Sequence, residues 1–396
     1  MFSEATWQFI TQHRFDDPKR LALQCRGLYP DVDLTSALQQ IAHRQAIKDK
    51  IPTWYATEGL VYPDRLSIEQ CSSEATALYK SALLAGKSFV DLTGGFGVDC
   101  AFIATKFQKA FYVEQQPQRC AVAEHNFPIL NLPQLTVVHA DAQCYLQQMN
   151  PVDCIYLDPA RRGRDGRKKF AISDCEPDII PLIGLLLQRA ECVLIKLSPM
   201  LDVDSALQVL PNTSEVHVVS VENECKELLF LLRRDLTAEP TIRCVNLSKG
   251  QKLMAFAFTR SEEKNAAVEY ASEILKFLYE PNASLMKAGA YKLLVGRFCL
   301  RKLHPNSHLY TSSRHLPDFP GRCFEVKAVS SFNKATMQQC TQHLRQANLS
   351  VRNFPATVDE LKKRLKLRDG GNDHLFATTL FPHNHVLILT EQRFRI

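Results

Sequence analysis

The stretch VDLTGGFGVD, residues 90–99, joins a short apolar run to a glycine-rich turn. The run ends at Asp91 and Leu92, the turn follows from Thr93 to Gly97, and a helix is expected from residue 98. Glycines in such a turn let the backbone approach a ligand closely, and the start of the helix offers N–H groups. A purely structural turn has a similar composition, so the turn alone does not define a ligand site.

From residue 88 onward, short apolar segments alternate with segments of helical spacing. The apolar segments are SFVDL, AFYVE, LTVVHAD, CIYLD and ECVLIKLS, with helices expected over 98–107, 117–127, 142–149 and 177–189. This alternation predicts an α/β fold, a mainly parallel sheet with helices on both faces. The segments VHVVSVENE and KELLFLLRRD follow each other without a helix, which predicts a final antiparallel strand.

Acidic residues stand at or near the ends of four consecutive predicted strands: Asp91, Glu114, Asp141 and Asp158. In a parallel sheet these ends lie along one rim, where ligands bind. Glu114 is placed to accept hydrogen bonds from ribose hydroxyls, and Asp141 to reach an adenine amino group. Each acid is also typical of a helix cap, but four in register favour a shared ligand site.

A basic segment follows the fourth acid. In YLDPARRGRDGRKK, residues 156–169, Asp158 and Pro159 are followed by six basic residues (Arg161, Arg162, Arg164, Arg167, Lys168 and Lys169). A guanidinium at residue 161 or 162 can stack on a base or clamp a phosphate, although a surface ion pair with nearby acids is the alternative. The later cations lie on a predicted loop, where solvated side chains are common but phosphate contacts are equally suited.

Composition bounds the class of protein. With 396 residues, 45% hydrophobic and 23% charged, the chain is typical of a soluble protein of two or three domains. It has no apolar run of the roughly 18 residues needed to span a membrane, and its N-terminus does not resemble a signal peptide. The thirteen cysteines are scattered without a C-x-x-C pair, which favours buried thiols in a reducing cytoplasm over a zinc or disulfide framework.

The charge is concentrated near the C-terminus. Residues 281–396 contain 18 Lys and Arg against 7 Asp and Glu, a net charge of +11, so residues 1–280 carry 6 − 11 = −5. This asymmetry fits a polyanion partner such as nucleic acid or, alternatively, a solvated basic surface. One predicted helix carries a cluster of these cations: Lys362, Lys363, Arg364, Lys366 and Arg368. The histidines at 304, 308, 315, 383 and 385 follow no metal-ligand pattern, and no metal is expected.

The pattern divides the chain into four predicted parts. Residues 1–85 are expected to be helical, with Asp17-Pro18 opening one helix and Ser72 or Ser73 capping another. Residues 86–235 hold the α/β sheet. Residues 236–322 are expected to contain a hairpin around 249–251, a helix over 262–278 and an irregular segment over 281–322. Residues 323–396 predict a small α+β unit.

The quoted segments carry a family resemblance. DLTGGFGVD, YVE, HADA and YLDPA resemble the ordered motifs of class I S-adenosylmethionine-dependent methyltransferases over roughly 68–235. More narrowly, EQCSSEATALYK, LDPARR, YEPNASLMKAGAYKLL, KLHPNSHLYTSS and VRNFPATVDELKKRLKLRDGG resemble a bacterial methyltransferase-like family with a C-terminal THUMP-like domain, over nearly the whole chain. The resemblance implies a Rossmann-like sheet, a ferredoxin-like linking part over 236–322 and a THUMP-like part over 323–396.

It also implies S-adenosylmethionine as cofactor and roles for individual residues. Asp91, Thr93, Gly94, Gly95 and Gly97 would cradle its methionine part, with Asp99 ordering the turn. Glu114 would hold the ribose, while Asp141 and Ala142 would contact the adenine. Gln70, Ser72, Ser73 and Glu74 resemble the segment that helps to hold the cofactor in related enzymes.

The fourth motif departs from the pattern of amino-methylating relatives, which is Asp/Asn-Pro-Pro-aromatic. Here Asp158, Pro159, Ala160 and Arg161 stand at these positions, so the acid remains and the aromatic platform is lost. The leading hypothesis is a cytoplasmic methyltransferase that acts on RNA, with Asp158, Pro159 and Arg161 as the catalytic group. An RNA-binding factor with an inactive fold and a protein or small-molecule methyltransferase remain as alternatives.

Overall fold

The computed structural model describes residues 2–25, 27–161, 172–236, 238–248 and 254–394. The chain forms two compact units: Met1–Ser214 with Leu228–Ala238, and Glu215–Glu227 with Glu239–Ile396. The hairpin of strands β8 (Thr213–Val221) and β9 (Glu224–Arg233) is divided between them. Each unit is described separately below.

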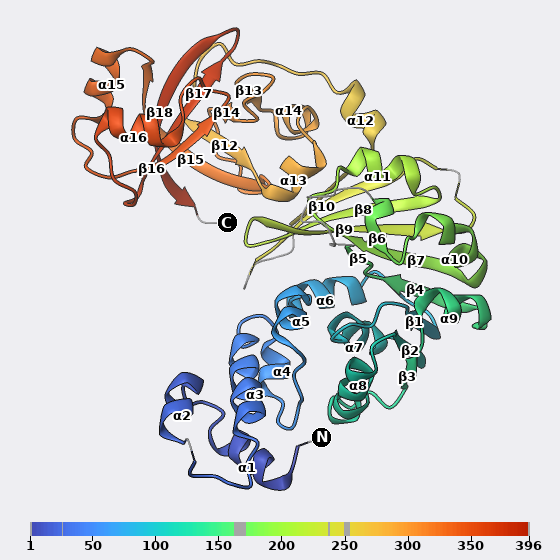
Figure 1. Cartoon of the computed structure of the whole chain (residues 1–396). Coiled ribbons are helices and arrows are strands. Elements are labelled where there is room, and N and C mark those ends of the chain that lie inside the picture. The colour runs from blue at the N-terminus through green and yellow to red at the C-terminus, as the bar shows by residue number, and fades with distance from the viewer. Residues whose placement is uncertain (1, 26, 162–171, 237, 249–253, 395–396) are drawn as a thin grey trace. The chain divides into compact units, whose positions relative to one another are not determined.

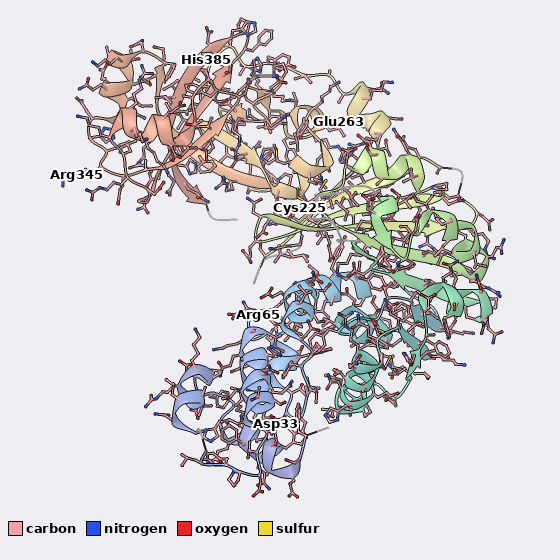
Figure 2. The ribbon with its side chains drawn as sticks, in the orientation of Figure 1. Asp33, Arg65, Cys225, Glu263, Arg345 and His385 are labelled. Atoms are coloured by element: carbon pink, nitrogen blue, oxygen red, sulfur yellow. The ribbon has the colours of Figure 1, made fainter. Side chains whose placement is uncertain are left out.

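The first unit begins with helices, drawn in blue in Figure 1. They are α1 (Glu4–Gln12), α2 (Pro18–Gln24), α3 (Leu34–Ala46), α4 (Pro52–Ala56), α5 (Arg65–Gln70) and α6 (Glu74–Ser81). The predicted cap at Asp17 is confirmed, because its side chain accepts from Lys19 N and Pro18 occupies the first turn. Asp33, labelled in Figure 2, caps α3 in the same way. Phe9, Ile41 and neighbouring apolar side chains form a small core between these helices.

The α/β part follows, and its strands have the predicted order and direction. They are β1 (Ser88–Asp91), β2 (Lys109–Glu114), β3 (Leu135–His139), β4 (Val152–Leu157) and β7 (Ala190–Leu197), followed by the hairpin. With β10 (Thr241–Leu247) and β11 (Met254–Phe258), the sheet runs β11-β10-β8-β9-β7-β4-β1-β2-β3. Strands β3, β2, β1, β4 and β7 are mutually parallel, whereas β9 runs antiparallel to β7. The predicted final antiparallel strand is therefore confirmed.

Helices connect these strands (Figure 1). They are α7 (Val98–Ala104), α8 (Pro117–Ile129), α9 (Ala142–Gln148), α10 (Ile183–Arg189) and α11 (Val203–Val209), and the short strands β5 (Ala160–Arg161) and β6 (Cys175–Glu176) form a separate pair. The helix predicted over 177–189 is shorter than expected, because short 3₁₀ turns at Ile172–Asp174 and Ile180–Leu182 precede α10. The strands β1 and β4 are buried almost completely, as expected for parallel strands covered by helices.

The second unit contains the rest of the chain. Its elements are β10 (Thr241–Leu247), β11 (Met254–Phe258), α12 (Arg260–Asn265), β12 (Phe277–Pro281), α13 (Ala283–Ala288), α14 (Leu293–Phe298), β13 (Arg301–Lys302), β14 (Tyr310–Ser312), β15 (Gly321–Ser331), α15 (Lys334–Thr341), β16 (Asn348–Arg352), α16 (Val358–Leu365), β17 (Asp373–Leu380) and β18 (Asn384–Phe394). Strands β10 and β11 form the predicted antiparallel hairpin, whose residues 249–253 lie outside the described residues. Seven strands form a sheet in the order β13-β14-β12-β15-β18-β17-β16.

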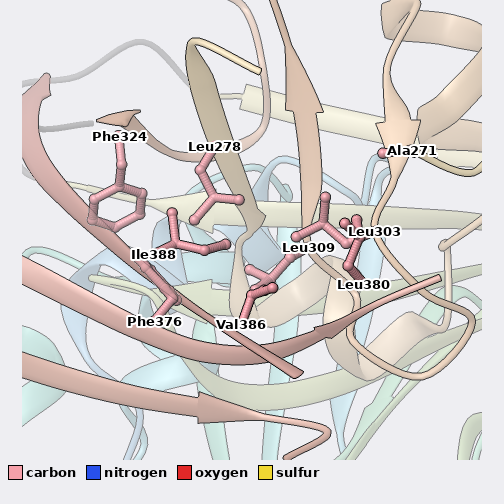
Figure 3. Close-up of a cluster of buried hydrophobic side chains, with 9 residues drawn as sticks. All are labelled: Ala271, Leu278, Leu303, Leu309, Phe324, Phe376, Leu380, Val386 and Ile388. Carbon is pink, nitrogen blue, oxygen red and sulfur yellow. The ribbon is translucent and has the colours of Figure 1, made fainter. Parts of the chain in front are cut away.

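Two expectations for this unit are wrong. The helix predicted over 262–278 ends at Asn265, and Phe277–Pro281 is a strand buried between β14 and β15. The segment 281–322, expected to be irregular, contains two helices and two strands. Pairing and burial in the sheet determine the backbone of these strands, which local spacing does not reveal. Figure 3 shows the core that results, in which Leu278 packs with Phe324, Phe376 and Ile388.

Among the residues that the structure describes, no helix is long and apolar enough to cross a membrane.

Candidate active site

The glycine turn connects β1 to α7, and its three glycines meet different requirements. A Cβ on Gly94 would lie 2.3 Å from the ring of Tyr112, and one on Gly97 would lie 3.0 Å from Phe127. These two glycines therefore serve close packing inside the unit. Gly95 has a φ of +58° and its nearest neighbour, a backbone oxygen, would be 3.7 Å from a Cβ. It is thus the glycine of this turn with room for a ligand beside its backbone.

Asp91, Thr93 and Asp158 are joined by hydrogen bonds across two strand ends. The Thr93 amide donates to Asp91 Oδ1 at 2.9 Å, and the Thr93 hydroxyl lies 3.4 Å from the same oxygen. The Asp158 amide donates to Thr93 Oγ1 at 2.6 Å. The turn after β1 and the acid after β4 are consequently held in a fixed relation.

Glu114 connects the second strand to the same turn. It is buried, and its carboxylate accepts the Gly95 amide at 2.9 Å and the Gln116 amide at 2.8 Å. Arg119 lies 3.9 Å from the same carboxylate. The predicted site residues Asp91, Thr93, Gly95, Glu114 and Asp158 are therefore brought together, as expected from acids at the rim of a parallel sheet.

Asp141 and Ala142 follow β3, which pairs with β2 up to His139 opposite Glu114. Asp141 is exposed and caps α9 by accepting the amides of Gln143 and Cys144. The alternative role of this acid as a helix cap is therefore confirmed. The cap leaves an exposed carboxylate at the same rim as Glu114.

The residues 70–74, which precede β1, have different roles. Ser73 caps α6, and Glu74 binds the backbone and hydroxyl of Thr53, so both stabilise the local helices. Gln70 ends α5 and is exposed. Ser72 is buried and points to Asp99, whose carboxylate it meets at 2.7 Å.

Asp99 lies at the centre of a buried polar cluster that the sequence analysis did not anticipate. Lys80 approaches its Oδ1 to 3.1 Å, and the hydroxyl of Tyr156 donates to its Oδ2 at 2.7 Å. Lys196, at the end of β7, lies 3.8 Å from Asp99 Oδ2 and 2.5 Å from Asp158 Oδ2. The sequence does contain one sign of this cluster, the lysine inside the apolar run CVLIKLS. A lysine in a buried strand indicates an acidic partner, because unpaired lysines are rarely buried.

The two buried aspartates differ in their electrostatics. Burial raises the pKa of Asp91 well above its usual range, and the charges of Asp99, Asp158 and Glu114 raise it further. For Asp99, burial also acts to raise the pKa, but the charges of Lys80 and Lys196 outweigh it and the pKa is lowered. Asp99 is therefore ionised and structurally paired, whereas Asp91 is an acid that a cationic ligand would stabilise in its charged form.

Pro159 is buried, and Ala160 and Arg161 form strand β5 opposite β6. The Arg161 side chain and the basic residues Arg162, Arg164, Arg167, Lys168 and Lys169 lie outside the described part of the chain. The catalytic role expected for Arg161 stays a prediction.

The basic C-terminal helix is α16 in the second unit. Leu361 is its buried anchor, Lys362 pairs with Asp369 at 2.7 Å, and Arg364 stacks over the ring of Phe332 at 4.7 Å. Lys363 is exposed on the helix and Lys366 is exposed at its C-cap, whereas Arg368, which was expected on the same helix, lies beyond its end. This helix thus presents cations to solvent while its apolar side packs inward.

Two of the histidines in this unit make structural contacts. His304 Nδ1 lies 3.0 Å from the Asn353 amide, and His385 Nδ1 lies 3.0 Å from Thr379 Oγ1. Over the described ranges, no group of three or more His, Cys, Asp or Glu side chains is arranged to hold a metal ion.

Known proteins resemble both parts of the chain. Residues 277–320 match a ferredoxin-like domain and residues 321–392 match a THUMP-like domain. The crystal structure of a "putative methyltransferase" from Porphyromonas gingivalis W83 is 36% identical, with a TM-score of 0.90 over 100% of both chains. Proteins named uncharacterized S-adenosylmethionine-dependent methyltransferase from two strains of Mycobacterium tuberculosis are 25% identical over 307 residues, covering 76% of this chain and 80% of theirs.

Proposed function

The chain belongs to the family of S-adenosylmethionine-dependent methyltransferases with C-terminal ferredoxin-like and THUMP-like domains, and from this premise we propose that it methylates RNA, with Asp158 orienting the nucleophile. One observation carries the role of Asp158. Thr93, in the glycine turn, accepts the Asp158 amide at 2.6 Å, so the proposed cofactor turn and the proposed acceptor site share one hydrogen-bonded frame.

The residues present fit this cofactor. S-adenosylmethionine, when bound, supplies a methyl group on a sulfonium whose carbon–sulfur bond breaks towards sulfur as the nucleophile attacks. It carries an ammonium and several hydrogen-bond donors, and the rim offers the carboxyl groups of Asp91, Glu114 and Asp141. Gly95 leaves space beside the turn, and Glu114 is oriented by two backbone amides. We assign the methionine part to the turn, the ribose to Glu114, and the adenine to Asp141 and Ala142.

Asp158 has the chemistry required of an orienting group. Its backbone is fixed by Thr93 and by the following Pro159, and its side chain is half-buried rather than enclosed. A carboxylate held in this way accepts a hydrogen bond from an N–H or O–H nucleophile and aligns the nucleophile's lone pair with the methyl carbon. The same carboxylate can take the proton that the nucleophile loses as its bond to the methyl carbon forms. Alignment of this kind, with water excluded, is what the protein contributes to methyl transfer.

RNA is the proposed acceptor because of the second unit. Residues 281–396 carry a net charge of +11, α16 presents exposed lysines, and the domain that contains them is THUMP-like. Basic surfaces of this kind bind phosphate backbones. We also retain as predictions the cytoplasmic location and the division at residues 85, 235 and 322.

The first test is isothermal titration calorimetry of the intact, folded protein with S-adenosylhomocysteine. Binding is expected, with loss in Glu114→Ala and no loss of secondary structure. The second test uses labelled S-adenosylmethionine and RNA from cells that lack the gene. Label is expected in the RNA with wild-type protein and at least 100-fold less with Asp158→Ala, as about 2.7 kcal/mol of barrier would predict.

Loss of the aromatic platform at Arg161 favours one second candidate, an RNA-binding factor without catalysis. It predicts RNA retention with no labelled product. A protein or small-molecule acceptor predicts instead that label appears in another fraction and that the charge of α16 does not affect the rate. Mass spectrometry of nucleosides from cells with and without the gene separates RNA methylation from both alternatives, and the presence or absence of label in another fraction separates the two alternatives.

A further inference from the structure

Lys196 links the buried polar cluster to Asp158. It stands at the end of β7, next to β4, and its ammonium lies 2.5 Å from Asp158 Oδ2 and 3.4 Å from Ser72 Oγ. The Lys196 side chain is 14% exposed, compared with 38% for Asp158. The lysine therefore approaches the carboxylate from the protein side and leaves the outer side of Asp158 towards solvent.

Among the described residues, Asp99 also lies near Lys196, and Asp99 already has its own cation. Lys80 is fully buried and lies 3.1 Å from Asp99 Oδ1, whereas Lys196 is 3.8 Å from Asp99 Oδ2. Tyr156 and Ser72 donate hydrogen bonds to Asp99 Oδ2 at 2.7 Å each. Charges thus alternate from Lys80 in the interior, through Asp99 and Lys196, to Asp158 at the rim. Of these two carboxylates, Asp158 is the one nearer to the Lys196 ammonium.

We propose that Lys196 is a positioning residue for methyl transfer, which offsets the charge of Asp158 and prevents this carboxylate from pairing with the cofactor sulfonium. The inference rests on the proposed function, because that function places Asp158 at the methyl group. It also defines the acceptor as an uncharged N–H or O–H group. A cationic amine would meet the ammonium of Lys196 next to the same carboxylate.

The reason is differential binding of ground and transition states. An uncompensated carboxylate beside the sulfonium would stabilise the bound cofactor, and that attraction would be lost as sulfur becomes neutral during transfer. Such stabilisation of the ground state raises the barrier. With Lys196 in place, Asp158 retains its hydrogen-bond acceptor for the nucleophile while its net attraction for the sulfonium is reduced.

The test compares two ligands that differ in charge only at sulfur. Dissociation constants for S-adenosylmethionine and S-adenosylhomocysteine are measured by calorimetry on the full-length protein. In Lys196→Met, the preference for S-adenosylmethionine is expected to rise about tenfold, the effect of one partly screened charge several ångströms away. Lys196→Arg is expected to keep the wild-type preference, and Asp158→Asn to lower it. A side chain that only supports the fold would weaken both ligands equally.

Controls separate the possible failures. Lys109→Met, an exposed lysine at the start of β2, should leave both affinities unchanged. If Lys196→Met does not fold, Asp158→Asn and the Lys196→Gln variant provide the same comparison. An unchanged ratio in folded Lys196→Met or Lys196→Gln, or in Asp158→Asn, would overturn the role of Lys196 while the proposed function stands. Failure of folded wild-type protein to bind S-adenosylhomocysteine would reject the proposed function and, with it, this inference.

Discussion

Asp91 is a carboxyl group that the fold buries near three other acids, Asp99, Glu114 and Asp158. Burial raises the pKa of Asp91, so the folded state resists ionisation that the unfolded state undergoes freely above about pH 4. The free energy of unfolding therefore falls as the pH rises from about 4 towards the raised pKa of Asp91. We expect Asp91→Asn, which still accepts from the Thr93 amide, to melt at higher temperature than wild type at pH 8 and at a similar temperature near pH 4.

Scanning fluorimetry from pH 4 to pH 8 checks this difference, and calorimetry should show weaker S-adenosylhomocysteine binding by Asp91→Asn. An equal loss of stability at every pH would mean that the carboxylate serves the fold rather than the ligand. The expected pattern is that of a binding residue retained at the cost of stability.

Other single residues show what a sequence can and cannot predict. Asp91, Glu114 and Asp158 were predictable because each follows an apolar strand, and parallel pairing brings such positions to one rim. The contacts of Lys80 and Lys196 were not, because Lys196 meets Ser72 across 124 positions and Tyr156 meets Asp99 across 57. No local pattern encodes which buried charge finds which partner. A lysine within the run CVLIKLS signals only that a partner must exist.

At the scale of elements, α16 is a short helix whose start is fixed by a capping box. The Thr357 hydroxyl accepts the Glu360 amide, and the Glu360 carboxylate accepts the Thr357 amide. We expect Thr357→Ala to destabilise this helix by about 1 kcal/mol and to weaken RNA binding, although no cation is removed. Hydrogen exchange across 357–366 and filter binding measure the two effects.

Helix α12 offers a matched control, because Thr259 and Glu262 form the same capping box there. Thr259→Ala should fray α12 and leave RNA affinity near that of wild type, since the six residues of α12 carry no net charge. Equal losses of affinity in the two variants would contradict a specific role for α16.

Elements with strong end signals were predicted well, and those defined by sheet pairing were not. Asp17-Pro18 marks a helix start by a side-chain hydrogen bond, and the glycine turn marks one by the left-handed backbone of Gly97. The segment around Phe277 has helical spacing and nevertheless forms β12, because all five of its residues are buried between neighbouring strands. Such burial depends on β14 and β15, which lie some 30 to 50 residues further along the chain.

At the scale of the whole molecule, the proposed cofactor residues and the excess positive charge lie in different segments of the chain. The proposed cofactor residues lie between Ser72 and Lys196, within the slightly acidic residues 1–280, and the excess positive charge lies in residues 281–396. This division was evident from composition, because net charge per segment needs no structure. The acceptor atom was not evident from composition. A short motif such as the one at Asp158 does not show which charges surround it, and the nearest cation described there is a lysine from another strand.

The separation of the proposed cofactor residues from the basic segment predicts that methyl transfer and RNA binding can be lost separately. Lys363 and Lys366 are exposed on or just after α16, and we expect Lys363→Glu with Lys366→Glu to raise the KM for RNA at least tenfold while kcat and S-adenosylhomocysteine affinity stay unchanged. Asp158→Ala should do the reverse, lowering kcat with RNA affinity retained, because it removes an interaction made to the nucleophile. Filter binding at two salt concentrations, calorimetry and methyl-transfer kinetics on the same preparations measure all three quantities. If charge reversal on α16 left the KM for RNA unchanged, the acceptor would reach Asp158 without this basic surface, and a protein or small-molecule substrate would become the better hypothesis.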